Sequence, residues 1–205
     1  METNLLTATR TPLADMVRIV GALSLHVSTD AMRGSLCAIS FTAGTIKATD
    51  TYTAAIFTPD TAITTGDELL INGRELLAAI SNANKVLKRD GAAMIDLVSD
   101  GRTWQLTATG ATGTSTASGL VCGGEYPNVA GIVKNTAADK LGEYLPTGFN
   151  ADYLGRVADA HNKFTGKADL PLVLTHWITN TKPMLWETRS DIGKLEQLLM
   201  PRRLA

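Results

Sequence analysis

Apolar residues recur every three or four positions in three stretches of the chain, and each stretch follows a residue suited to starting a helix. The first follows Pro12, the second Asn72 and Gly73, and the third Asn150 or Asp152. This spacing puts the apolar side chains on one helix face, so helices are predicted to begin near residues 12, 73 and 150. The apolar positions are Leu13, Met16, Val17, Val20, Leu23 and Val27, then Leu76, Leu77, Ile80, Ala83 and Leu87, then Tyr153, Leu154, Val157, Ala158 and His161.

Between these stretches the pattern changes to short runs rich in Thr, Val, Ile and aromatic residues, which are typical of strands. The Asp100–Gly101 pair between two such runs predicts a hairpin. Residues 192–200 fit either a short helix or a terminal strand, and periodicity alone does not decide between them. The other predicted strands are residues 36–41, 45–49, 52–57, 68–71, 93–98, 103–107, 112–121, 172–179 and 184–188.

The chain therefore repeats one order of elements, a helix followed by several strands, three times. Such a unit covers only one face of its sheet, so two units can close a core together and a third has no mate. The prediction is an α+β fold in which the third unit pairs with its counterpart in a second chain or is covered by the preceding units. The polar stretch 131–145 is the predicted seam before it.

Composition narrows the class of protein. Hydrophobic residues make up 44% of the 205 residues, which is enough for a core. Lys plus Arg is 19 and Asp plus Glu is 20, so a strongly basic nucleic-acid coat is excluded but a local basic stripe is not. Cys37 and Cys122 have no CxxC partners, and no membrane span or signal peptide is apparent. These features predict a cytoplasmic protein with reduced thiols and no membrane contact.

Motifs for catalysis or cofactor binding are missing from the sequence. It contains no GxSxG, Walker A or GxGxxG pattern. The histidines, His26, His161 and His176, are scattered without metal-ligand spacing. We therefore expect no enzyme activity, no catalytic residues, no metal and no cofactor.

Four local sequences resemble one protein family. They are ATDTYTAA at 48–55, GGEYPNV at 123–129, GFNADYL at 148–154 and LLMPRRL at 198–204. In this order they resemble segments of the bacterial DNA polymerase III beta subunit, the sliding clamp. The resemblance implies a shortened clamp, with residues 1–133 as a complete clamp-like domain and 134–205 as the C-terminal half of another. It also implies a strand near 198–204.

The resemblance implies a DNA-clamp fold and a role as a processivity factor in DNA replication. Clamp helices face a central hole through which duplex DNA passes, and the sheets face outward. Phosphate contacts of this kind are electrostatic and independent of base sequence. An ordinary solvated helix face remains the alternative for each basic residue. The candidate DNA-binding residues on or next to the helices are Arg18, Arg74, Lys85, Lys88, Arg89, Arg156 and Lys163.

The family also docks DNA polymerase and repair partners through short peptides, which need an apolar pocket with a few polar anchors. Here Thr51–Ala54 stand where the family has GHRL, so one pocket wall matches less well than the other. Leu198 and Met200 could instead be core, and Asp50 is expected to have a structural role in a turn. The candidate pocket residues are Thr49, Thr51, Tyr52, Ala54, Leu198, Met200 and Pro201.

The unpaired third unit predicts a homo-oligomer. Family rings use twelve helix-containing units, so four chains of three units are one arithmetic route to a ring. The alternative is a protein-interaction module that is derived from a clamp, does not encircle DNA and modulates replication proteins. It is favoured because a first domain and half of the last one have no counterpart in the matched motifs.

Overall fold

The structure, a computed structural model, describes residues 7–61, 64–65, 67–138, 148–167, 170–177 and 182–202. Its helices are α1 (Leu13–Leu23), α2 (Gly73–Val86), α3 (Val129–Ala138) and α4 (Ala151–Thr165), with 3₁₀ segments at Ser24–His26 and Ala31–Cys37. Its strands are β1 (Thr7–Pro12), β2 (Ala38–Thr42), β3 (Thr45–Thr49), β4 (Thr53–Pro59), β5 (Thr64–Thr65), β6 (Leu69–Asn72), β7 (Met94–Ser99), β8 (Thr103–Gly110), β9 (Gly113–Leu120), β10 (Val173–His176), β11 (Met184–Ser190) and β12 (Gly193–Leu199). The predicted α+β class is confirmed.

The three predicted helices begin where the sequence indicates. The Asn72 side chain accepts hydrogen bonds from the amides of Arg74 and Glu75 and so caps α2. Asn150 caps α4 in the same way through the amide of Asp152. None of the helices in the described part of the chain is long and apolar enough to cross a bilayer.

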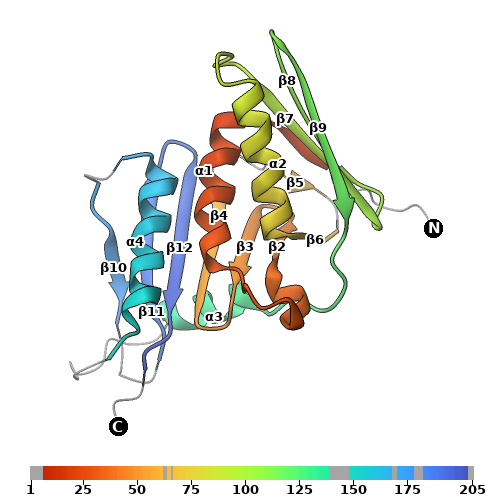
Figure 1. Ribbon diagram of the computed structural model, residues 1–205. Helices are drawn as coiled ribbons and strands as arrows, with labels where there is room; N and C mark the ends of the chain where they lie inside the picture. Colours follow the sequence, from red (N-terminus) through yellow and green to blue (C-terminus); the bar gives the residue numbers. More distant parts are fainter. Residues whose placement is uncertain are drawn as a thin grey trace.

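The strands form two antiparallel sheets, ordered β5-β1-β7-β8-β9 and β10-β11-β12-β4-β3-β2-β6. We define unit 1 as α1 with β2–β4, unit 2 as α2 with β7–β9, and unit 3 as α4 with β10–β12. Helices α4, α1 and α2 lie side by side as one layer against the sheets (Figure 1). The predicted threefold repetition is thus present.

Units 1 and 3 are joined edge to edge. Strand β12 inserts between β11 and β4 and pairs with β4 along its whole length, from Gly193 opposite Pro59 to Leu199 opposite Thr53. Beneath this joint the Phe164 ring of α4 meets the Phe57 ring of β4 edge to face, with centroids 5.6 Å apart. Unit 3 is therefore covered by unit 1, and the ambiguous tail is a strand that begins earlier than the predicted residue 198.

The outer face of the seven-stranded sheet has its own apolar cluster, under α3. Val129 and Val133 of α3 pack there with Tyr126, Ile56 and Leu198. Within the predicted polar seam over 131–145, residues up to Ala138 are helical, with Val133 buried against the sheet and Ile132 exposed. Residues 139–147 lie outside the described residues. The division at residues 133 and 134 stays a prediction, since strands from both sides share one sheet.

Candidate functional site

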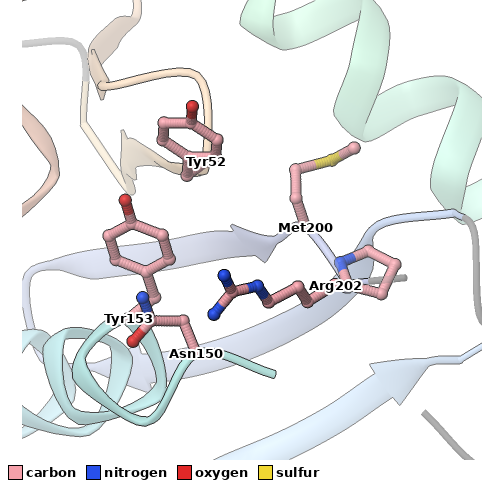
Figure 2. A pocket seen from close by; sticks show the side chains of 6 residues that line it. Tyr52, Asn150, Tyr153, Met200 and Arg202 are labelled. Carbon is pink, nitrogen blue, oxygen red and sulfur yellow. The ribbon is translucent and has the colours of Figure 1, made fainter. Parts of the chain in front are cut away.

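A pocket of about 350 Å³ opens where the joint between units 1 and 3 ends. Its walls come from the turn after β3, the start of α4 and the segment that follows β12 (Figure 2). Three predicted residues, Tyr52, Met200 and Pro201, line it. The sequence analysis did not assign the other lining residues to the pocket, and these are Asn150, Tyr153 and Arg202.

Backbone pairing positions the walls of the pocket. The amide of Met200 donates to the Tyr52 carbonyl at 2.9 Å, which extends the β12–β4 pairing to the rim. The amide of Arg202 donates to the carbonyl of Gly148 at 2.8 Å. The chain after β12 is thereby held against both the β3–β4 turn and the start of α4.

The remaining predicted pocket residues support the wall instead of lining it. Thr49 is buried, and its hydroxyl donates to the Thr53 carbonyl at 2.8 Å. Ala54 and Leu198 are directly opposite each other across the joint and belong to the outer apolar cluster. Leu198 is therefore a core residue, which is the alternative considered for it above. Met200 is not, because it is 38% exposed.

Two aromatic rings and two guanidinium groups order the rim. The rings of Tyr52 and Tyr153 stack with centroids 5.4 Å apart. Arg156 lies over the Tyr153 ring and its Nη1 donates to Asp50 Oδ2 at 2.7 Å. On the other side, Arg33 donates to the Asp50 carbonyl and to the Thr51 hydroxyl, at 2.9 and 2.8 Å.

The lining chemistry suits an extended ligand with an apolar side chain and an anionic or hydrogen-bonding group. Met200, Pro201 and the tyrosine rings offer apolar contact. The Asn150 amide and the Arg202 guanidinium offer hydrogen bonds, and Figure 2 shows the Arg202 side chain extending toward the first turn of α4. The pocket lining thus combines apolar side chains with one guanidinium group.

The helix layer holds the second candidate surface. Arg74, Lys85 and Lys163 are exposed, and so are Lys88 and Arg89 just beyond α2. No ion pair joins any of these five cations to another described residue. Three of them, Lys85, Lys88 and Arg89, cluster at the C-terminal end of α2.

The other two predicted cations are engaged inside the joint. Arg18 donates to the Phe164 carbonyl and to Asp191, both at 2.8 Å, and so ties α1 to unit 3. This hydrogen bond holds the pKa of the Asp191 carboxyl below its usual value. Arg156 is paired with Asp50, as described above. These two arginines thus connect unit 1 to unit 3. The cations of α2, by contrast, have no carboxylate partner among the described residues.

Known structures share this arrangement. A DNA polymerase sliding clamp from Pseudomonas aeruginosa superposes with a TM-score of 0.63 at 15% identity, over 98% of this chain and 67% of that one. A Helicobacter pylori beta clamp in complex with 3,4-difluorobenzamide gives 0.59 at 14%, over 100% and 67%. Caulobacter crescentus pol III beta gives 0.58 at 11%, over 100% and 68%. This chain has the sliding-clamp fold. The resemblance seen in the four motifs is thereby confirmed for the fold.

The sliding-clamp fold is recognised by shape and not by overall sequence. No family model matches the chain, and no curated protein matches it. The chain spans about two thirds of the length of the clamps it superposes on.

Titratable groups in the described part of this sliding-clamp fold do not assemble a metal site, since no three His, Cys, Asp or Glu side chains converge there. His26 is buried between unit 1 and β12, where its Nε2 is 3.1 Å from Gln197 Oε1, and burial lowers its pKa to about 4. Cys37 and Cys122 are free thiols, and burial raises the pKa of Cys122.

Proposed function

We propose that this protein is a replication processivity factor that encloses duplex DNA without reading its sequence and docks polymerase or repair proteins through the pocket at the joint. The observation that carries the proposal is the sliding-clamp fold over nearly the whole chain. A clamp needs no catalytic centre, because it acts by tethering.

The α2 cations support the DNA part of the proposal. Lys85, Lys88 and Arg89 are exposed and carry no carboxylate partner among the described residues, so they are available to phosphates. Such contacts are long-ranged and blind to base sequence, which permits sliding. Binding should therefore weaken steeply with added salt.

The pocket supports the partner part of the proposal. Its apolar side chains and the Arg202 guanidinium fit a short peptide with an apolar anchor and an acidic group. Met200 gives the lining a flexible side chain that adapts to different ligands. A bacterial polymerase-tail peptide is the ligand class to test first.

The DNA proposal is tested by retention on circular and linear duplexes. A ring stays on circles and runs off free ends, whereas a simple basic surface treats both alike. Lys85→Glu/Lys88→Glu should reduce retention on circles by roughly tenfold or more, because two phosphate contacts become repulsive. The matched control is Arg102→Glu/Lys134→Glu, which makes the same charge change at exposed positions outside the helix layer. Equal retention by both double variants would rule out the α2 assignment.

The rival is an interaction module with the clamp fold that does not enclose DNA. Two of the seven predicted DNA-binding cations, Arg18 and Arg156, already donate hydrogen bonds within the protein and are less available to phosphates. This observation favours the interaction module. This module would show no preference for circles yet would bind a polymerase-tail peptide. In that assay Tyr153→Ala should abolish peptide binding, while Met32→Ala, at an exposed methionine that does not line the pocket, should leave it unchanged.

A further inference from the structure

Cys37 and Cys122 are the two cysteines of the chain, and the proposed function uses neither of them. Both are free thiols and half-buried, so small molecules in solution can reach them. Cys37 ends the 3₁₀ segment before β2, and Cys122 lies two residues after β9. They are far apart in sequence, yet the fold brings both to the junction between β6 and α2.

The segments that carry the two cysteines touch each other before they reach this junction. The Ser35 hydroxyl donates to the Glu125 carbonyl at 3.0 Å. A Cβ on Gly124 would lie 3.7 Å from the Cβ of Ser35, which is a separation that a disulfide spans. Each cysteine lies two residues from this contact in the direction of β6, so the two come next to each other.

The end of β6 is a shared neighbour of the two thiols. Ala38, the residue after Cys37, is opposite Asn72. The amide of Cys122 donates to the β6 backbone at 2.8 Å. Burial raises the pKa of the Cys122 thiol, the charges of Glu75 and Cys37 raise it further, and a hydrogen bond from the Asn72 amide lowers it. The two thiols therefore lie beside Asn72 and within range of each other's charge.

The backbone around each cysteine has room to move. Cys37 Sγ is 3.0 Å from the Asp30 carbonyl oxygen, and a thiol is only a weak donor. Gly34 breaks the 3₁₀ segment with φ 50° and ψ −112°. A Cβ on Gly34 or on Gly123, next to Cys122, would meet no described atom within 4 Å. Small shifts of either segment can therefore bring the sulfurs together.

We propose that Cys37 and Cys122 form a reversible disulfide, which makes the junction of β6 and α2 a thiol-oxidation site. The oxidant is a small-molecule disulfide such as oxidised glutathione. This bridge goes beyond the proposed function and does not depend on DNA or peptide binding.

The reaction is two successive thiol–disulfide exchanges. Cys37 reacts first, because burial keeps Cys122 in its protonated, less reactive form. Cys37 loses its proton and attacks one sulfur of oxidised glutathione, whose S–S bond breaks and releases one glutathione with that proton. Cys122 then loses its proton and attacks the Cys37 sulfur, which releases the second glutathione. Two protein thiols are thereby oxidised by two electrons, and one oxidised glutathione is reduced to two thiols.

Peptide mapping by mass spectrometry tests the bridge. The native protein, treated with oxidised glutathione and digested without reduction, should give one peptide pair joined through Cys37 and Cys122, and dithiothreitol should separate the pair. Cys122→Ser should stop at a glutathione adduct on Cys37, which isolates the first exchange. The native chain unfolded in urea is the control that the oxidant is active. Two free thiols, lasting adducts on both cysteines, or disulfides between chains would each overturn the proposal.

Urea unfolding tests whether the bridge fits the native fold. A disulfide that closes a long loop restricts the unfolded chain, so oxidation should raise the urea midpoint of the native protein by about 1 M or more. The matched control is Cys37→Ser/Cys122→Ser, whose midpoint should be the same before and after treatment. An oxidised native protein that is no more stable than the reduced one would contradict a bridge formed in this fold.

Discussion

Two turns of the molecule share one hydrogen-bonding pattern and differ in burial and in the elements that contact them. One joins β3 to β4 and is led by Asp50, and the other joins β7 to β8 and is led by Asp100. In each, Oδ1 of the aspartate accepts the amides two and three positions later, at 2.9 and 2.7 Å for Asp50 and at 2.8 and 2.6 Å for Asp100. The local sequence therefore makes the same turn twice.

The second carboxylate oxygen separates the two turns. Asp100 is exposed, and its Oδ2 accepts the hydroxyl of Thr103. The amides of Thr103 and Arg102 hold its pKa below the usual value. Asp50 is buried, and its Oδ2 accepts Arg156 of α4. The comparison teaches that a turn aspartate becomes a connector between units when a second element reaches its free oxygen.

The residue with positive φ also differs. Gly101 has φ 85° in one turn, whereas Thr51 has φ 78° in the other. Thr51 is the one residue other than glycine with positive φ in the described part of the chain, and a β-branched residue is strained there. Its hydroxyl accepts a hydrogen bond from Arg33, which offsets part of the strain.

Removing the two carboxylates should give the largest contrast. Asp50→Ala should lower the free energy of unfolding by about 3 kcal/mol, because buried turn amides and Arg156 lose their acceptor. Asp100→Ala should cost clearly less, because water replaces the acceptor at an exposed site. Urea unfolding followed by circular dichroism measures both, and equal losses would show that the connector role of Asp50 adds nothing.

Removing the partner on α4 should have a smaller effect. Arg156→Ala leaves the buried Asp50 carboxylate with its turn amides alone and should cost about 2 kcal/mol. Arg156→Met keeps the apolar stem over Tyr153 and so serves as the control for packing. If both variants unfold like the native protein, the ion pair contributes no more than an exposed one.

Exchanging the residues with positive φ should have a smaller effect again. Gly101→Thr should destabilise the protein by about 1 kcal/mol, because it places a β-branched residue at positive φ with no arginine to donate to its hydroxyl. Thr51→Gly should change stability by less, since relief of strain is offset by loss of the Arg33 contact and by added freedom of the unfolded chain. A large loss in Thr51→Gly would mean that the hydroxyl contact dominates the strain.

The smallest effect concerns the ionisation of His26. Burial dominates and lowers the pKa of this histidine to about 4, while Gln197 and Asp50 raise it and Arg156 lowers it further. Asp50→Asn should therefore lower the pKa further and Arg156→Ala should raise it, as measured by NMR titration of the ring. Because the unfolded chain takes up this proton near pH 6.5 and the folded chain near pH 4, the stability from neutral His26 is complete above 6.5 and is lost as pH falls toward 4. A pKa near 6.5 in the folded protein would contradict this account.

Local pattern was enough to predict most of the fold. Helix starts at Asn72 and Asn150 and the hairpin at Asp100–Gly101 are visible because caps, apolar spacing and turn residues lie within a few positions of one another. Helix α3 was missed because only Val129, Val133 and Thr136 of its ten residues are buried, and they pack on strands from elsewhere in the sequence.

The site was predicted only in part for the same reason. Asn150 and Tyr153 look like the cap and first turn of a helix, and nothing near them indicates that the turn after β3 lies alongside. The arginines on α1 and α4 look like surface cations, yet the carboxylates to which they donate hydrogen bonds are 173 and 106 residues away in sequence. Pairings of that range are decided by the assembled sheet.

The insertion of β12 between β11 and β4 also constrains the order of folding. Among the described strands β12 is the last to leave the ribosome, yet it occupies the middle of the larger sheet. Until it emerges, β4 has a bare edge, and its buried Phe57 lacks Leu195, the residue opposite it. We therefore expect the nascent chain to keep the β4 edge unpaired until β12 has emerged and to depend at that stage on chaperone protection.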